Sequence, residues 1–273
     1  MMAATRLVLK YGIRPVYGPP MPVGLQRTLG DLAGRLQRIP RSVTTTHVQL
    51  GERRARRYAG PGAASDAAVL WLHGGAFITG SVRTHGSLAA HLALASGLPV
   101  YLLDYRLAPE HKHPAAVDDA VAALKAIPED RVVLGGDSAG GGLALLAADR
   151  GTRDLAGIAL ISPLLDLTHE SARAHEGEEV LVRADWAEQG VQAMFGDQPP
   201  VVPDPTVPLV VHVAEHERLR AEGEALARRV GGELYCVPGG WHDIHLQAAL
   251  VREAGHAVRL LGASIARLVE ENP

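Results

Sequence analysis

Short apolar runs alternate along the chain with longer segments rich in helix-forming residues. The runs have the length and the β-branched content of buried strands, and we expect strands near residues 45–50, 54–58, 67–72, 98–103, 131–135, 157–161, 208–213 and 233–237. Helical segments separate most of them, and the clearest lie near residues 84–96, 114–126, 139–150, 217–230 and 252–269. This alternation predicts an α/β protein with a mostly parallel sheet and helices on both faces.

A serine lies at the centre of the motif Gly-Asp-Ser-Ala-Gly, residues 136–140, where a predicted strand gives way to a predicted helix. A strand that turns straight into a helix holds such a serine in a strained backbone and pushes its hydroxyl clear of the sheet. A side chain at Gly136 or Gly140 would collide with the neighbouring strand or helix, and we expect both positions to adopt dihedral angles that only glycine accepts. The motif predicts that Ser138 is a nucleophile, presented rather than buried.

A second motif, His73-Gly74-Gly75-Ala76, follows the third predicted strand, in a loop whose small residues leave backbone N–H groups free. Acyl transfer passes through a tetrahedral intermediate whose negative oxygen is held by such groups. We expect the amides of Gly75, Ala76 and Ala139 to form this oxyanion hole, while Gly74 shapes the loop. Taken alone, the motif also fits a tight turn beside a core histidine.

Three sequence blocks carry a resemblance to a known family: residues 73–81 (HGGAFITGS), 104–111 (DYRLAPEH) and 136–141 (GDSAGG). In this order they resemble the bacterial branch of the hormone-sensitive lipase-like family of α/β-hydrolases, and residues 162–168 look like a fourth block. The resemblance covers about residues 45–270. It implies the α/β-hydrolase fold, with an eight-stranded sheet and a small helical cap, and it implies a serine carboxylesterase. His73 and Asp137 belong to the motifs that carry it.

One position departs from the family's pattern, which has a third glycine where this chain has Ala76. The methyl group is expected to narrow the space for the acyl oxygen and to restrict the dihedral angles of the loop. It leaves the N–H group in place. The resemblance therefore implies an oxyanion hole that works but is altered.

The remaining two members of a triad should follow in the order acid, then histidine, each after a later strand. The family's pattern acid-x-Leu-Arg-x-Glu-Gly matches residues 217–223, which puts Glu217 at the acid. Glu215, two residues earlier, is the alternative acid, because the long side chain of a glutamate could reach a histidine from either position. His242 follows the last predicted strand and matches the family's histidine, with His245 as the alternative.

The implied mechanism follows from where charge develops. His242 takes the proton of Ser138 as the serine attacks an ester carbonyl, while Glu217 fixes the imidazole tautomer and stabilises its cation. His242 then protonates the leaving alcohol, and water repeats the cycle. This chemistry needs no metal or organic cofactor, and the sequence has no cysteine pair, no His-Glu-x-x-His motif and no phosphate loop with a lysine.

The length of 273 residues suits one domain, and we expect residues 1–273 to form a single α/β-hydrolase domain. Residues 1–44 precede the sheet and contain leucines at helical spacing: Leu25, Leu29, Leu32 and Leu36. They predict an amphipathic helix that packs over the site or, alternatively, on the flank of the fold. Residues of about 170–206 are shorter than in the family and end in a proline-rich connector. We expect these two segments to form a reduced cap.

Composition narrows the substrate and the partners. An aromatic content of 4% argues against a carbohydrate-stacking cleft, so short to medium acyl esters are the expected small-molecule substrates. A formal net charge of −3 argues against a nucleic-acid partner. No segment has the length of a membrane helix or the pattern of a signal peptide, so we expect a soluble, cytoplasmic protein without stable membrane insertion. The resemblance suggests a homodimer.

Two other functions stay open. The same triad and oxyanion hole serve any acyl transfer, so an amidase or arylformamidase on this scaffold is the nearest alternative. The other is a catalytically weak, ligand-binding relative of the hydrolases. Such relatives commonly lack a triad member, whereas this chain has candidates for all three.

Overall fold

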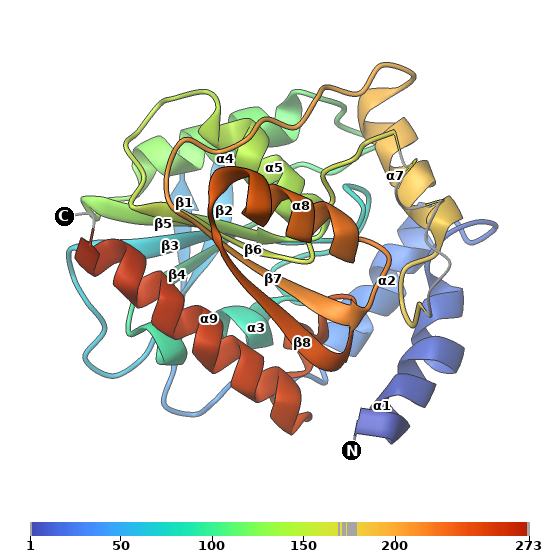
Figure 1. Cartoon of the computed structure of the whole chain (residues 1–273), viewed down its shortest axis with the longest axis horizontal. Coiled ribbons are helices and arrows are strands. Elements are labelled where there is room, and N and C mark those ends of the chain that lie inside the picture. The colour runs from blue at the N-terminus through green and yellow to red at the C-terminus, as the bar shows by residue number, and fades with distance from the viewer. Residues whose placement is uncertain (1, 169, 171–172, 174–178, 272–273) are drawn as a thin grey trace.

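A single sheet of eight strands runs through the part of the chain that the computed structural model describes, residues 2–168, 170, 173 and 179–271. Its strands are β1 (Thr44–Leu50), β2 (Arg53–Ala59), β3 (Ala67–Leu72), β4 (Val100–Leu103), β5 (Arg131–Asp137), β6 (Gly157–Ile161), β7 (Leu209–His216) and β8 (Glu233–Trp241). Their order is β1-β2-β4-β3-β5-β6-β7-β8 (Figure 1). β2 pairs antiparallel with β1 and β4, and all other neighbours are parallel. The predicted α/β-hydrolase sheet is confirmed.

Helices cover both faces of the sheet. They are α1 (Met2–Val8), α2 (Val23–Gly34), α3 (Gly86–Ser96), α4 (Ala115–Ala126), α5 (Ala139–Ala148), α7 (Ala184–Phe195), α8 (Arg220–Val230) and α9 (Arg252–Glu271), with shorter helical turns at Leu9–Ile13, Arg14–Val16 and Ile244–Gln247. α4, α5 and α8 lie on one face, and α3 and α9 lie on the other (Figure 1). α1, α2 and α7 gather at one end of the sheet.

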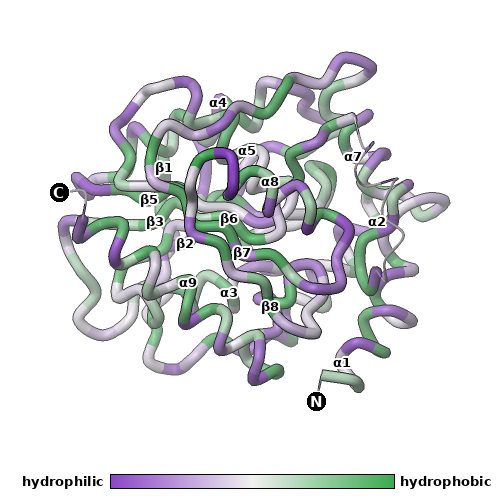
Figure 2. The backbone as a smooth tube through the Cα atoms, in the orientation of Figure 1, coloured by the Kyte–Doolittle hydropathy of each residue, from purple (hydrophilic) through white to green (hydrophobic). Residues whose placement is uncertain are grey.

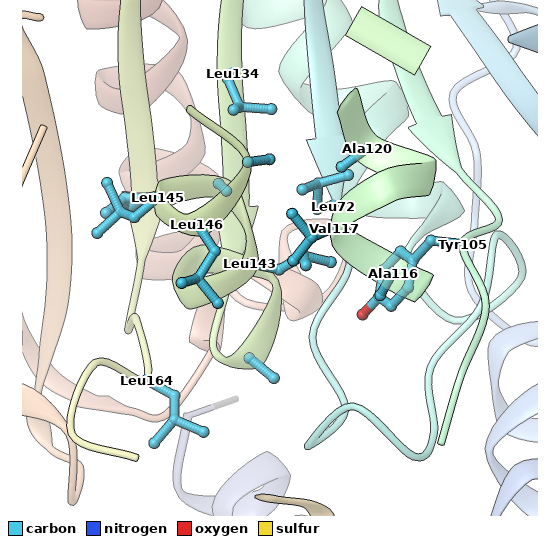
Figure 3. Packing of buried hydrophobic residues seen from close by; sticks show 14 of the residues in the cluster. Leu72, Tyr105, Ala116, Val117, Ala120, Leu134, Leu143, Leu145, Leu146 and Leu164 are labelled. Carbon is cyan, nitrogen blue, oxygen red and sulfur yellow. The ribbon is translucent and has the colours of Figure 1, made fainter. Parts of the chain in front are cut away.

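The buried core occupies both faces because the central strands are apolar along their length. Every residue of β3 is buried, as expected for a parallel strand that is covered on both sides. In Figure 2 hydrophilic residues concentrate in the surface helices and loops. On one face Leu72 of β3 packs with Val117 of α4 and Leu143 of α5 (Figure 3). This packing fixes the end of β3, from which the predicted oxyanion loop leaves.

Two elements near the expected site differ in extent from the prediction. The helix expected from residue 217 begins at Arg220, and the strand expected to end at residue 237 continues to Trp241. β8 is the edge of the sheet, so Pro238 lies within it although proline has no N–H to donate. As a result His242 follows the strand directly.

Helix α2 is present where the leucine pattern predicts a helix, but it packs through another face. Its buried residues are Gln26, Gly30 and Gly34. The glycines allow close approach, because a Cβ atom at Gly34 would lie 2.8 Å from the carbonyl oxygen of Arg83. The prediction that the leucines pack over the site is wrong for the three that are exposed: Leu25, Leu32 and Leu36. The buried side of α2 therefore carries two glycines and Gln26 instead of the leucines.

Only part of the second predicted cap segment, residues of about 170–206, belongs to the described chain, since residues 171–172 and 174–178 lie outside it. Residues 197–208 form neither helix nor strand, as their prolines predict. Trp186 of α7 contacts Tyr17, with ring centroids 4.7 Å apart. The two segments predicted to form the cap therefore touch.

Candidate active site

Ser138 lies in a strained turn between β5 and α5. Its dihedral angles are φ 50° and ψ −121°, a region that costs a non-glycine residue free energy. A Cβ atom at Gly136 would overlap with the carbonyl oxygen of Gly140, and one at Gly140 would overlap with that of Leu72. The steric prediction for these glycines is confirmed, but the prediction about their dihedral angles is wrong, because neither has a positive φ. Ser138 itself carries the strain.

Ser138 is also less accessible than the motif predicts. Only 8% of its surface is exposed, so the serine is buried rather than presented. Ser138 is among the residues that line a cavity.

The carboxylate of Asp137 ties the serine turn to the loop after β3. It accepts hydrogen bonds from the indole of Trp71 (2.7 Å), the amide of Gly74 (2.8 Å) and Nε2 of His85 (2.9 Å). Burial alone would raise the pKa of Asp137, but the charge of His85 and these hydrogen bonds hold it below its usual value. Burial alone would lower the pKa of His85, and Asp137 raises it. The two groups form a buried ion pair that anchors the loop.

The predicted oxyanion loop has a left-handed backbone. Gly75 has φ 121° and Ala76 has φ 51°. The amide of Gly74 donates to Asp137, so Gly74 shapes the loop instead of donating to an oxyanion. The amides of Gly75 and Ala76 have no acceptor among the described residues, and Ala139 begins α5, where an amide has no partner in a preceding turn. These three amides are the candidate oxyanion hole.

The side chain of Ala76 faces α7 rather than the cavity beside Ser138. It is buried in the core, and a Cβ atom added at Gly190 would lie 2.8 Å from its methyl carbon. Ala76 does not line that cavity. The expectation that its methyl group narrows the acyl site is therefore wrong, because α7 receives the methyl group. The expected restriction of the backbone dihedral angles at Ala76 still applies, since a left-handed conformation costs an L-residue about 1–2 kcal/mol.

His73 supports the loop from inside the protein. Its ring stacks on Tyr105, with centroids 4.3 Å apart, and the Tyr105 hydroxyl donates to the backbone oxygen of His73 at 2.6 Å. Burial and the neighbouring His85 lower the pKa of His73 to about 4, so the ring is neutral. These contacts join two of the sequence blocks that carried the family resemblance.

Glu217, and not Glu215, reaches the predicted histidine. Oε2 of Glu217 lies 2.8 Å from Nδ1 of His242, and Oε1 accepts a hydrogen bond from the amide of Ala214 at 2.7 Å. Glu215 is exposed and accepts a hydrogen bond from the amide of Gly239 instead, which lowers its pKa. The geometry therefore favours Glu217 as the partner of His242.

His242 lies between two carboxylates. While Nδ1 faces Glu217, Nε2 lies 3.1 Å from Oδ2 of the neighbouring Asp243. Burial alone would lower the pKa of His242, but Asp243, and after it Glu217, raise it well above the usual 6.5. Within the described part of the chain no hydrogen bond joins the Ser138 hydroxyl to His242. His245, the alternative base, pairs instead with another buried histidine at 3.0 Å.

A cavity of about 160 Å³ opens beside these groups and is lined by Ser138, His242 and Asp243. Its apolar walls come from both predicted cap segments and from the turn after β8: Leu9, Ile13, Tyr17, Leu181, Trp186 and Leu246. For scale, an apolar cavity of about 150 Å³ takes up one benzene molecule. A larger cavity of about 410 Å³ lies elsewhere, between the end of α5 and the proline-rich connector. The small cavity is the one that adjoins the candidate nucleophile.

The chain matches the family model described as alpha/beta hydrolase fold over residues 69–246, a range that contains the candidate oxyanion loop, the serine turn, Glu217 and His242. The chain belongs to this family. This α/β-hydrolase is 34% identical over 220 residues to an acetyl-hydrolase of Streptomyces hygroscopicus, a match that covers 71% of the chain and 74% of that protein. It is 31% identical over 223 residues to an ethyl acetate hydrolase of Pseudomonas putida, with 70% of each chain covered.

Comparison with a solved structure identifies the branch of the family. The crystal structure of an esterase from the bacterial hormone-sensitive lipase family covers 98% of both chains with a TM-score of 0.86 and 27% identity. The resemblance drawn from the sequence blocks is confirmed. This α/β-hydrolase belongs to the bacterial hormone-sensitive lipase-like branch.

Two residues at the site were not found by sequence reasoning. His85 precedes α3, far in sequence from Asp137, so only the folded chain shows that they pair. Asp243 is adjacent to His242, but neighbouring side chains meet only where the backbone bends, and Asp243 has a left-handed φ of 53°. The family motifs gave no signal for either contact.

Within the described ranges, no cluster of three or more His, Cys, Asp or Glu side chains could hold a metal ion. In those same ranges, every helix is too short or too polar to span a lipid bilayer.

Proposed function

We propose that this α/β-hydrolase is a serine carboxylesterase that hydrolyses esters with a short to medium acyl group through Ser138, His242 and Glu217. The observation that carries the proposal is the 2.8 Å contact between Glu217 Oε2 and Nδ1 of His242, a residue that lines the same cavity as the strained Ser138. The proposal agrees with the names of the similar proteins, which are an acetyl-hydrolase, an ethyl acetate hydrolase and an esterase.

The geometry supports a two-step acyl transfer. Ser138 attacks the ester carbonyl as Nε2 of His242 accepts its proton, and Glu217 stabilises the imidazolium through Nδ1. The tetrahedral oxyanion lies at the amides of Gly75, Ala76 and Ala139. His242 then protonates the leaving alcohol, and a water molecule repeats the sequence on the acyl-enzyme.

The size of the cavity supports a small acyl group. About 160 Å³ is below the roughly 300–1,000 Å³ of sites for drug-sized ligands, and most of the wall is apolar. The relative named for ethyl acetate agrees with this choice. We place the preferred acyl chain at the short end of the expected range.

The test is the hydrolysis of a p-nitrophenyl ester series from acetate to dodecanoate, with matched p-nitroanilides and with Ser138→Ala as control. We expect the highest kcat/KM at acetate to butyrate, slower amide turnover, and a loss of about 10³-fold or more in the variant. Preference for the anilides would favour the amidase alternative. Equal, background-level rates for wild type and variant on all substrates would favour the ligand-binding alternative.

A further inference from the structure

Both ring nitrogens of His242 face a carboxylate oxygen, Nδ1 facing Glu217 at 2.8 Å and Nε2 facing Asp243 at 3.1 Å. The contact at Nδ1 is a hydrogen bond, and the contact at Nε2 lies within the distance of an ion pair. An ion pair on the Nε2 side requires the cationic ring, which carries a proton on both nitrogens. The three side chains are nearly inaccessible to solvent, which strengthens the attraction between their charges. The resting geometry is therefore that of an imidazolium held between two carboxylates.

Nε2 is the nitrogen that a general base needs. Under the proposed function it takes the proton of Ser138, and a nitrogen that already carries a proton cannot do so. Asp243 therefore occupies the position opposite Nε2 that the serine hydroxyl has to reach. This explains why no hydrogen bond joins Ser138 to His242 among the described residues.

Asp243 is held in this place by its backbone. Its dihedral angles are φ 53° and ψ 35°, and its amide donates to the hydroxyl of Ser162 at 3.4 Å. Oδ2 faces His242, whereas the buried Oδ1 has no hydrogen-bond partner among the residues that the structure describes. The second oxygen of the carboxylate is thus unsatisfied, which makes the contact with Nε2 the main compensation for burying the charge.

The charged groups around the pair come from three other elements. Glu217 follows β7, Asp137 ends β5, and His85 precedes α3. Burial raises the pKa of Asp243 to about 6, with the nearby Asp137 and Glu217 acting in the same direction and His242 acting against them. At neutral pH the carboxylate is mostly ionised, so it favours the cationic form of His242.

We propose that Asp243 is a positioning residue that restrains the catalytic base: it holds Nε2 of His242 in the resting enzyme and must release it before Ser138 can be deprotonated. This inference rests on the proposed function of His242. Loss of the imidazolium proton at alkaline pH releases the contact. Asp243 therefore shifts the acid limb of the plot of kcat/KM against pH to higher pH. Removal of its carboxylate should shift this limb to lower pH.

The test compares kcat/KM for p-nitrophenyl butyrate from about pH 5 to pH 10 in the wild type, Asp243→Asn and Asp243→Gly. Asparagine and glycine both tolerate a left-handed backbone, so two variants keep the turn. We expect both to exceed the wild type by roughly tenfold or more near pH 6 and to match it within about threefold on the alkaline plateau. Glu215→Gln, which alters a carboxylate that faces Gly239, should leave the midpoint unchanged.

The same midpoint in the wild type and both Asp243 variants would overturn the inference, whereas activity that survives Ser138→Ala would overturn the proposed function instead. An NMR titration of the His242 ring gives a readout that needs no turnover. We expect the ring to lose its proton at lower pH in Asp243→Asn than in the wild type. An unchanged titration would also overturn the inference.

Discussion

Gly190 of α7 lies so close to Ala76 of the candidate oxyanion loop that a Cβ atom at Gly190 would overlap with the Ala76 carbonyl oxygen. α7 belongs to a segment predicted to form the cap, so this segment packs directly against the residue whose amide is a candidate for holding the oxyanion. Ala76 has a left-handed φ of 51° at this contact. A substitution in α7 should therefore change the rate of ester hydrolysis as well as the free energy of unfolding.

We expect Gly190→Ala to lower the free energy of unfolding by about 1–3 kcal/mol, because overpacking forces the loop or the helix to move. The same shift should lower kcat by about tenfold or more, since it displaces the Ala76 amide. Chemical denaturation and ester kinetics measure the two effects. Gly24→Ala in α2 is the matched control, because a Cβ atom there meets no atom of the described residues within 4 Å and alanine favours a helix.

Glu217→Gln should lower kcat by about 10²–10⁴-fold with little change in KM, because the amide can no longer stabilise the imidazolium. Glu215→Gln should stay within about threefold of the wild type, since Glu215 faces Gly239. Ester kinetics at a pH on the alkaline plateau provide the comparison. A severe loss in Glu215→Gln with a mild one in Glu217→Gln would reverse the assignment.

His85→Leu should cost about 3–5 kcal/mol of stability, because it leaves the buried charge of Asp137 without its partner. Since Asp137 raises the pKa of His85, this stabilisation is complete below the unfolded pKa near 6.5 and declines as pH rises through the folded pKa. Denaturation at several pH values measures the difference from the wild type. His91→Gln, in the helix that follows His85, should change the free energy of unfolding by less than about 0.5 kcal/mol. An equal loss in this variant would mean that His85 has no special role in stability.

Trp186→Ala should enlarge the cavity and shift the preferred ester towards longer acyl chains. The indole contacts Tyr17 and forms part of the cavity wall. We expect the ratio of kcat/KM for octanoate over acetate to rise by roughly tenfold, since added methylenes then find apolar space. An unchanged ratio, with both rates equally lower, would mean that the acyl group does not occupy this side of the cavity.

The sheet and the motif-bearing residues could be predicted because their causes are local. A parallel strand that is buried on both faces is a continuous apolar run, and a serine turn needs small residues at fixed positions on either side. Gly136 and Gly140 have the steric reason that the motif suggests, whereas the unusual dihedral angles belong to Ser138. The motif correctly places strain at the serine, whereas the unusual dihedral angles that it also suggests for the two glycines are not found.

The contacts that the sequence did not reveal depend on how distant segments approach. The leucines of α2 have the spacing of a packed face, yet Gly30 and Gly34 allow a closer approach and bury the opposite side. The pairing of Asp243 with His242 depends on one left-handed residue in the turn after β8. No periodicity or spacing rule reports such a turn, and so the environment of the base became visible only in three dimensions.

The central claim is that Ser138 is the nucleophile, and covalent trapping tests it most directly. The protein is treated with a p-nitrophenyl alkylphosphonate, release of p-nitrophenol is measured, and the modified residue is located by peptide mass spectrometry. We expect one equivalent of release, a single adduct on Ser138 and loss of esterase activity in the same proportion. An adduct on another residue, or full activity in protein modified at Ser138, would contradict the account.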